Sequence, residues 1–549
     1  MRKLASLIAL ILLAGCAQIP TQIDVRSGPE IAAQSDQEFA YYTPSGPALD
    51  ATQQEIVSGF LAAGTGPQND YAVARSFLTS DFSQRWNPDA AVLIRSGAPT
   101  FRESGAGLQV VTLAINARLD EHGRYLAPAS NDVVSLRFQL VIENGQWRIA
   151  SAPNLTVVTP PVFAVVFKPY SVYFLDSQQQ RLVADSRWFP SRASTGTRLV
   201  NALLDGPSDW MAPAVQTAIP LGTKLTIDAV RVEDGVAQVD FDTTALSADA
   251  ITRRLMLTQL RATLLQLSGV NEVAIYVNSS PQDITPTSIQ PLRNGSPGIA
   301  LSDGVFRLVG GQEALPGTAV FAERFEPTLM ATNSLTNQIV FATPTGVYLL
   351  SGSGVSTRTQ LLTEQSAVAA LAFDPDGFIW VVPKDSGSAI EIYDRAELVQ
   401  TLVLPALGNR VEAEVSSDGA RFAVLIEGQD RNRIDVFTVS RDVRSRPSLL
   451  NKGLTISTTQ GAPLSFTWQS QVGLRVLESS TTGQTTLSEY PLAGQRIQLS
   501  TPPIVGVKLI SGPSSFTNYL LSDLGEVWTL SGGSWRRVAS DVVDITSAR

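Results

Sequence analysis

The stretches VAALAFDPDGFIWVVP (residues 368–383) and VEAEVSSDGARFAVLIEG (residues 411–428) decide the fold. Each has a strand of mostly apolar residues, then an Asp-Gly turn, then a second strand. The two turns, Asp376-Gly377 and Asp418-Gly419, lie 42 residues apart. A strand-turn-strand unit repeating at about 40–45 residues is typical of one four-stranded propeller blade. The spacing therefore predicts a β-propeller.

The surrounding sequence extends this prediction to residues 298–549. Helical periodicity is absent from about residue 298 onward, and short strands alternate with turn residues. Examples are NQIVFATPTGVYLLSG (337–352), SFTWQSQVGLRVLES (465–479) and NYLLSDLGEVWTLSGGSWRRV (518–538). Roughly 250 residues at about 42 per blade give about six blades.

Residues 49–160 have a different pattern, with helices first and strands after them. EIVSGFLAA (55–63) and YAVARSFL (71–78) place apolar residues at helical spacing, whereas DVVSLRFQLVI (132–142) alternates. Asn144-Gly145 is a hairpin signal before QWRIAS. This order predicts an α+β domain of the NTF2 type.

Residues 161–285 predict a second α+β domain. YSVYFLD (170–176) reads as a strand and IDAVRVEDGVAQVDFD (227–242) as a hairpin that turns at Asp234-Gly235. The longest helix of the chain follows, with Ser247 near its N-cap, Gly269 closing it, and an apolar stripe of Leu257, Leu260, Leu264 and Leu267. We expect this stripe to pack on the domain's own sheet rather than to bind a partner groove.

The N-terminus contains the only cysteine of the 549 residues, within LIALILLAGCAQIP (7–20). A basic start, an apolar run too short to span a bilayer and the small residues before Cys16 predict a signal peptide over residues 1–15, cut between Gly15 and Cys16. The LAGC pattern resembles a bacterial lipobox, which implies a diacylglycerol thioether on Cys16 and N-acylation. The alternative is a plain secretory signal with an incidental cysteine. Residues 16–48, rich in Pro, Gly, Ser and Gln, then form a lipidated tether on the outer face of the cell membrane.

Composition excludes several classes of function. The chain without residues 1–15 has 39 basic and 50 acidic residues, a net charge near −11, so a nucleic-acid partner is not expected. One cysteine and one histidine allow neither an internal disulfide nor an ordinary zinc site. We therefore expect no metal and no cofactor.

The candidate catalytic residues are few. His122 lies in the loop DEHG, where we expect a solvated turn residue rather than a catalytic base. Asp374-Pro-Asp376-Gly resembles the start of a calcium loop, but the later acidic ligands are missing and a tight turn is favoured.

Two acidic pairs and four tryptophans complete the inventory. Because the members of each acidic pair share one face of a strand, we expect Asp240 with Asp242, and Glu412 with Glu414, to be solvated. The propeller's tryptophans suit a sugar platform or a core, and the core is favoured because two of them lie in alternating strands. They are Trp380, Trp468, Trp528 and Trp535. The inventory predicts a protein that is not an enzyme, although carboxylates brought together from separate blades would escape this search.

Longer segments resemble a known family. EIVSGFLAAG (55–64) and YAVARSFLTSDFSQRWNP (71–88) resemble the LpqB lipoproteins of actinobacteria. LVNALLDGPSDW, VAQVDFD and LSGVNEVAIYVN, within residues 170–280, look like the GerMN domain, and the C-terminal part looks like the LpqB propeller. The resemblance spans nearly the whole chain in the family's order.

The resemblance implies a role without catalysis. LpqB-type lipoproteins are associated with the MtrA/MtrB two-component system, in which the lipoprotein binds the extracellular domain of the sensor kinase MtrB and modulates signalling in cell-envelope homeostasis and division. The alternatives are a lipoprotein that binds cell-wall glycans and an envelope hydrolase that uses scattered carboxylates. The hydrolase hypothesis requires three or more acids to converge in one pocket.

Overall fold

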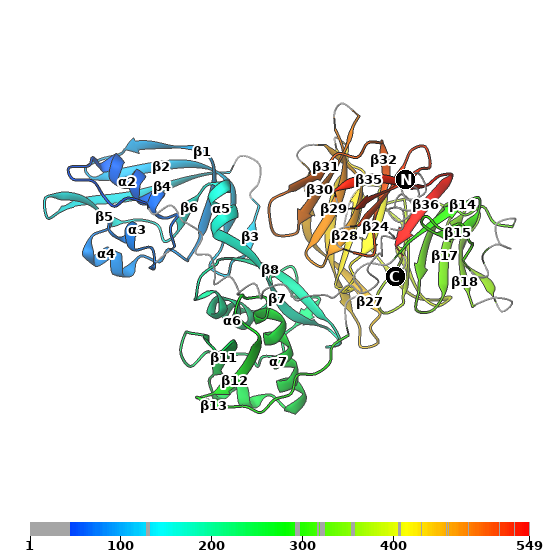
Figure 1. Ribbon diagram of the computed structural model, residues 1–549, viewed down its shortest axis with the longest axis horizontal. Coiled ribbons are helices and arrows are strands. Elements are labelled where there is room, and N and C mark those ends of the chain that lie inside the picture. The colour runs from blue at the N-terminus through cyan, green and yellow to red at the C-terminus, as the bar shows by residue number, and fades with distance from the viewer. Residues whose placement is uncertain are drawn as a thin grey trace, which may run out of the picture. The chain divides into compact units, whose positions relative to one another are not determined.

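The computed structural model describes residues 44–549 with several gaps (Figure 1). Gly15 and Cys16, with the predicted signal peptide and nearly all of the tether, lie outside the described residues. Of the helices within the described ranges, none combines the length and apolar character needed to cross a membrane. The positions left out are 68, 128–131, 291–296, 316–317, 319–323, 353–356, 405–407, 430, 457, 459–460, 481–482, 515–516, 532 and 548–549.

The N-terminal domain packs three helices on one mainly antiparallel sheet of order β5-β4-β2-β1-β6, with β3 paired to β2. Thr52 and Glu55 form a reciprocal capping box that starts the first helix. Ile56 and Phe60 of this helix are buried with Phe138 of the sheet, so the predicted α+β character is confirmed. The elements are α2 (Gln53–Ala63), α3 (Ala72–Arg75), α4 (Ser80–Arg85), β1 (Val92–Glu103), β2 (Leu108–Leu119), β3 (Tyr125–Leu126), β4 (Val133–Glu143), β5 (Gln146–Ser151) and β6 (Thr156–Val158).

The second domain has two sheets, β8-β7-β9 and β10-β11-β12-β13, with helices packed against them. Leu257, Leu260 and Leu264 are buried in its core, which confirms that the leucine stripe packs on the domain itself. The long helix is capped by Asp249 rather than near Ser247. The elements are α5 (Pro160–Val166), β7 (Phe167–Asp176), β8 (Leu182–Pro190), α6 (Thr195–Asp205), β9 (Val215–Gln216), β10 (Arg231–Glu233), β11 (Val236–Phe241), η1 (Thr243–Ser247), α7 (Ala250–Leu264), β12 (Glu272–Val277) and β13 (Ser280–Pro281).

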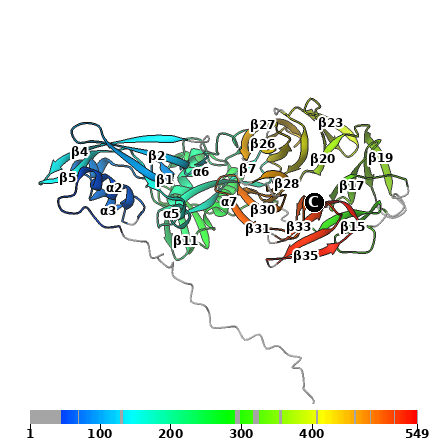
Figure 2. The same cartoon turned by 90° about the horizontal axis from the view of Figure 1, so that it is seen from above.

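The C-terminal domain is a propeller of six sheets, which confirms the predicted fold (Figure 2). Blade 1 is β36-β14-β15, and blades 2 to 6 each contain four consecutive strands. The strands are β14 (Gly298–Ser302), β15 (Val305–Leu308), β16 (Leu329–Asn333), β17 (Gln338–Thr343), β18 (Gly346–Ser351), β19 (Arg358–Thr363), β20 (Val368–Phe373), β21 (Ile379–Pro383), β22 (Ile390–Asp394), β23 (Glu397–Leu402), β24 (Arg410–Val415), β25 (Arg421–Ile426), β26 (Arg433–Arg441), β27 (Pro447–Ile456), β28 (Ala462–Ser470), β29 (Gly473–Ser479), β30 (Thr485–Pro491), β31 (Ile497–Ser500), β32 (Gly506–Ser511), β33 (Asn518–Ser522), β34 (Val527–Ser531), β35 (Ser534–Ala539) and β36 (Val542–Ser547).

The last strand of the chain closes the ring. β36 pairs with β14, the first strand of the propeller, and so supplies the innermost strand of blade 1. The innermost strands β36, β16, β20, β24, β28 and β32 each contact the next one around the ring. The two ends of the propeller sequence therefore hold each other in place.

Closure by β36 predicts a stability difference between neighbouring residues of this strand. Ile545 is fully buried, whereas 56% of Val543 is exposed. We expect Ile545→Ala to lower the free energy of unfolding by about 2–5 kcal/mol and Val543→Ala to change it by about 0.5 kcal/mol or less. Urea unfolding of both variants tests this, and equal losses would contradict closure of the ring by β36.

Candidate functional site

The loop between β20 and β21 carries the sequence Asp374-Pro-Asp-Gly and forms a tight turn, as predicted. Asp374 accepts the backbone N–H groups of Asp376 and Phe378 through Oδ1, at 3.0 and 2.9 Å. Its Oδ2 lies 2.9 Å from Nη1 of Arg441. Among the residues with a described position, no group of three or more His, Cys, Asp or Glu side chains is placed to hold a metal ion.

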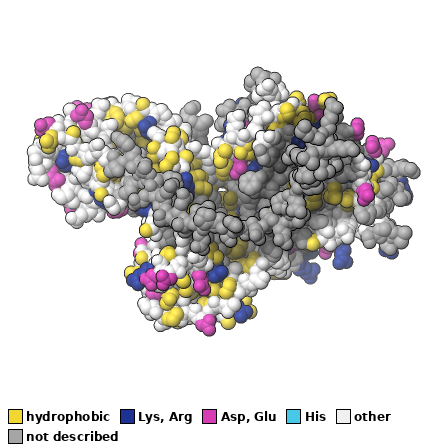
Figure 3. Space-filling view, in the orientation of Figure 1, with side chains coloured by type: hydrophobic (Ala, Val, Ile, Leu, Met, Phe, Trp, Pro, Cys, Tyr) yellow, Lys and Arg dark blue, Asp and Glu magenta, His cyan; other side chains and the backbone are white. Residues whose placement is uncertain are grey.

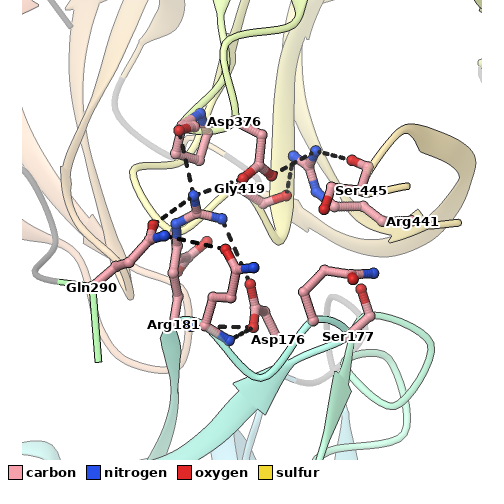
Figure 4. Close-up of polar contacts among 12 residues, drawn as sticks. Asp176, Ser177, Arg181, Gln290, Asp376, Gly419, Arg441 and Ser445 are labelled. Carbon is pink, nitrogen blue, oxygen red and sulfur yellow. Dashed lines mark hydrogen bonds and ion pairs between the residues drawn. The ribbon is translucent and has the colours of Figure 1, made fainter. Parts of the chain in front are cut away.

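Asp376 joins the propeller to the second domain. Its Oδ1 lies 2.6 Å from Nη2 of Arg181, which follows the β7–β8 turn, and its Oδ2 lies 3.1 Å from Nη1 of Arg441 (Figure 4). Arg181 also bonds to Gln290 at 3.0 Å and is only 7% exposed at its side chain. Buried charges are stable only when paired, and the Arg181–Asp376 pair takes one partner from each domain. We call this contact the ionic seam.

A second strip of contacts extends the ionic seam across blades 4 and 5. Arg421 pairs with Asp418 at 2.6 Å, donates to the carbonyl of Ala184 in β8 and lies over the ring of Trp210. Gln471 accepts the N–H of the same Ala184 through its side-chain oxygen. Gly453 allows the close approach, because a Cβ there would lie 2.4 Å from Trp210.

The N-terminal and second domains meet around the histidine. Nδ1 of His122 lies 2.8 Å from the Asp205 carboxylate at the end of α6, and Nε2 lies 3.5 Å from Glu121. His122 lies in a turn, as expected, but it is only partly solvated, because 28% of its side chain is exposed. Beside it, Asp89 is held by Arg192 and Arg198 at 2.6 and 3.0 Å. His122 is thus a partner in a domain contact.

These residues line a cleft of about 390 Å³ that also contains Asp228. Asp89, Glu121, Asp205 and Asp228 therefore line one pocket. The hydrolase hypothesis requires three or more acids in one pocket, and this cleft has four. Three of them are engaged, since Asp89 pairs with two arginines, Asp205 with His122, and Asp228 accepts a hydrogen bond from Asn201 at 2.9 Å. The cleft thus contains the required number of acids, but Asp89 and Asp205 are engaged in contacts between the two domains and Asp228 in one within the second domain.

Trp188 touches all three domains. Its ring packs on Tyr125 of the N-terminal domain and on Phe163 of α5, with centroid separations of 6.3 and 4.8 Å. Its Nε1 donates to the carbonyl of Ala493 in the propeller at 2.6 Å. Its backbone N–H donates to the carbonyl of Gly123 at 2.8 Å. Trp188 therefore contacts residues of all three domains at one point.

All of these propeller contacts lie on one face of the ring. The loops of Asp376, Asp418 and Gln471 join a first strand to a second strand, so they lie at the C-terminal ends of the innermost strands. Ala493 lies in a loop between a third and a fourth strand, at the same face. The mouth of the channel at the N-terminal ends of the innermost strands is on the opposite face.

This opposite mouth is lined by a repeated irregularity. In blades 1, 3, 4, 5 and 6 the pairing of the innermost strand shifts by one residue near its start, leaving one residue unpaired. Such β-bulges re-aim side chains. We call these residues the collar; all are apolar, and they are Val543, Ala369, Val411, Leu464 and Val507.

The channel behind the collar has a cavity of about 180 Å³. Glu412 and Glu414 line it, and the expectation that both are solvated is wrong. Glu412 accepts the backbone N–H of Phe466 and Glu414 that of Trp468, each at 3.0 Å, on the innermost strand of the next blade. Burial raises the pKa of Glu412 to about 7. These carboxylates connect blades 4 and 5.

The remaining predicted residues also have structural partners. Asp240 accepts the N–H of Ser279 at 3.0 Å and Asp242 caps η1 through Thr244, and both residues are only partly exposed. Trp380 is fully buried and Trp468 is 6% exposed, which confirms a core role for these two. Trp528 and Trp535 are half-buried.

Sequence reasoning missed Arg181, Arg441, Trp188 and the collar. Arg181 and Asp376 are 195 residues apart, so no local pattern links them. The collar has a weak signal, an apolar residue directly before the channel-facing position in each innermost strand. In the view of Figure 3, Lys and Arg side chains are scattered rather than gathered in one patch.

The chain is a multidomain propeller protein with a GerMN module. Its two α+β domains lie on one face of a six-bladed ring, where the ionic seam holds them. Three family descriptions match the chain in order: "Lipoprotein LpqB, N-terminal domain" over residues 46–164, "Sporulation and spore germination" over 171–283, and "Lipoprotein LpqB beta-propeller domain" over 303–546. The chain belongs to the LpqB family of lipoproteins.

Two relatives carry the name of this family, and two solved structures show a weak likeness. Lipoprotein LpqB of Bifidobacterium longum is 26% identical, covering 98% of this chain and 97% of the relative. That of Cutibacterium acnes is also 26% identical, covering 81% and 76%. The first GerMN domain of GerM from Bacillus subtilis is 20% identical, with a TM-score of 0.19, covering 23% of this chain and 92% of that chain. A nidogen/laminin complex gives a TM-score of 0.37 at 11% identity, covering 46% and 99%.

The ionic seam predicts a large loss of stability when its shared carboxylate is removed. Asp376→Ala leaves the buried Arg181 and Arg441 without one of their partners. We expect the free energy of unfolding to fall by about 3–5 kcal/mol, measured by urea unfolding. The control Asp283→Ala removes an exposed carboxylate of the second domain and should change it by about 0.5 kcal/mol or less. A similar small change for Asp376→Ala would contradict the ionic seam.

Glu412 predicts a defined pH dependence of stability. The folded-state pKa is raised from 4.5 to about 7, so the folded protein holds this proton more tightly, and its contribution to stability is lost as pH rises from about 4.5 to 7. Glu412→Gln keeps an oxygen acceptor for Phe466 without the charge. We expect the variant to match the natural protein at pH 5 and to be about 1–3 kcal/mol more stable at pH 8. Parallel pH profiles of the two proteins, measured by urea unfolding, would contradict the burial of this carboxylate.

Proposed function

We propose that this protein is a membrane-anchored, extracytoplasmic lipoprotein that binds the extracellular domain of a sensor kinase of the MtrB type and modulates two-component signalling in cell-envelope homeostasis and division. The observation that carries the proposal is the propeller face opposite the ionic seam. It combines an exposed apolar centre with acidic surroundings, and the contacts that hold the other domains lie on the other face.

The apolar centre of this face is the collar. Val411, Val507 and Val543 are 42%, 45% and 56% exposed. Apolar side chains gathered at one exposed site, with polar residues around them, are characteristic of protein interaction sites. Burial of these side chains against a partner would stabilise a complex by removing apolar area from water.

The loops around this mouth carry negative charge. Exposed acids come from the loops of five blades, with Lys384 and Arg431 as exposed cations on the same loops. An acidic rim favours a partner with a basic contact surface and steers its approach. The acids are Asp303, Glu364, Asp385, Glu427, Asp523 and Asp541.

The proposed anchor increases the effect of a weak contact. A lipid on Cys16 at the outer face, followed by the tether of residues 16–48, would confine the propeller and a membrane kinase to the same layer. Tethered partners meet at high effective concentration, so modest affinity suffices for occupancy. Because of this high effective concentration, a single contact face on the propeller is enough for the proposed binding role.

The proposal is tested by calorimetric titration of the mature chain, with Cys16→Ser, against the extracellular domain of the neighbouring sensor kinase. We expect saturable binding that the double variant Val507→Ser, Val543→Ser weakens about tenfold or more, because two apolar anchors are lost. The matched control Leu398→Ser, 49% exposed on the outer strand β23, should bind like the natural chain.

The two alternative functions, glycan binding and hydrolysis, predict different experimental results. Absence of heat with the kinase domain, together with co-sedimentation of the protein with purified cell wall, would replace the proposal with glycan binding. Release of soluble saccharides from that cell wall, lost in Asp205→Asn, would instead favour a hydrolase that uses the acidic cleft beside His122.

A further inference from the structure

We propose that the propeller channel binds a primary ammonium group on an unbranched aliphatic stem, as in a lysine side chain, with the collar around the stem and Glu412 bound to the ammonium. The inference concerns the channel itself and goes beyond the proposed kinase contact. The binding of an ammonium group and the binding of the kinase can be tested independently of each other.

The cavity has the size and position that such a ligand needs. Its volume of about 180 Å³ exceeds that of an engineered cavity of about 150 Å³ that holds benzene. Collar residues and the residues that follow them line the same cavity, including Val411 with Glu412 and Val507 with Lys508. The first polar groups that an aliphatic stem meets behind the collar are therefore Glu412 and Lys508.

The collar suits methylene groups. Four collar residues line the cavity, and the wall at β20 combines Ala369, Ala370 and Ala372 with Leu371 and Phe373. Burial of each methylene contributes about 0.8 kcal/mol. This mostly aliphatic wall offers apolar contacts to an unbranched chain.

Glu412 provides the anionic group below the collar. It accepts the backbone N–H of Phe466 at 3.0 Å, and the side chain of Ser465 is a second hydrogen-bond partner. The nearby cation, Lys508, is ion-paired with the buried Asp544. Asp544 also accepts the N–H of Met330 at 3.0 Å. The charge of Lys508 also acts on Glu412 and opposes the rise of its pKa, so Glu412 shares this cation with Asp544. Because a carboxylate has two oxygens that can each accept more than one hydrogen bond, Glu412 retains acceptor capacity.

A second group in the cavity wall also lacks a partner. Thr332 is 4% exposed, lines the channel from β16, and its Oγ1 has no hydrogen-bond partner among the described residues. A buried hydroxyl without a partner is costly unless a ligand or water satisfies it. An ammonium group, or water that accompanies it, supplies hydrogen-bond donors. The acidic rim adds long-range attraction for the cation and excludes anions.

The test uses n-butylammonium, which has the length of a lysine side chain, and n-butanol, which has a similar shape without charge. Saturation-transfer NMR titrations with the mature Cys16→Ser chain measure both affinities. We expect n-butylammonium to bind about tenfold or more tightly than n-butanol. Glu412→Gln should abolish this difference, whereas Glu397→Gln on the outer strand β23 should preserve it.

A collar variant keeps the test informative if Glu412→Gln does not fold. Val507→Ser should weaken the binding of n-butylammonium and of n-butanol alike, and the control Leu398→Ser should weaken neither. The inference is overturned if n-butylammonium shows no saturable binding, if n-butanol binds equally well, or if Glu412→Gln retains the natural affinity for n-butylammonium.

The source of the ammonium is decided by competition. If acetyl-Gly-Lys-Gly-amide displaces n-butylammonium, the site accepts a lysine side chain within a peptide. If the peptide does not compete while n-butylammonium binds, the site is specific for free alkyl amines. Both results support the site, and neither depends on whether the kinase domain binds.

Discussion

The arrangement of this protein depends on one shared carboxylate. Asp376 of the propeller lies between Arg181 of the GerMN-type domain and Arg441 of blade 4. Burying these charges costs free energy unless each is paired with an opposite charge. The ion pairs therefore stabilise the docked arrangement of the two domains relative to any partly separated one. Trp188, with its contacts to the N-terminal domain and to Ala493, adds the third domain to the same arrangement. As a result, one face of the ring is covered and the other is available.

A second constraint builds the channel. Each innermost strand has a neighbouring blade on both faces and presents some backbone N–H groups that its own sheet does not satisfy. Side chains from the preceding blade accept them: Glu412 for Phe466, Ser465 for Leu509 at 2.9 Å, and Asp544 for Met330. The ring is thus closed by polar contacts between blades as well as by β36. Polar groups required by the fold also give the channel its chemistry.

The sequence predicts the structural features that depend on local repetition. It does not predict the contacts between residues that are far apart in the chain. The propeller and its six blades follow from the spacing of Asp376-Gly377 and Asp418-Gly419, and the leucine stripe of α7 follows from helical periodicity. The predictions for Glu412 and Glu414 fail because alternation normally separates a buried face from a solvated one. In an innermost propeller strand, however, both faces meet another blade. His122 is the turn residue that the sequence predicts, but its partner Asp205 is 83 residues away, so no local pattern indicates this contact.

The central claim is that the ionic seam fixes the GerMN-type domain on the propeller and leaves the collar face available. With Cys16→Ser the chain has no cysteine, so spin labels can be placed at Ile251→Cys on α7 and Leu398→Cys on β23, both exposed. Double electron–electron resonance then measures the distribution of distances between the two domains. The account predicts one narrow distribution that broadens when Asp376→Ala is added. A broad or multiple distribution in the absence of Asp376→Ala would contradict it.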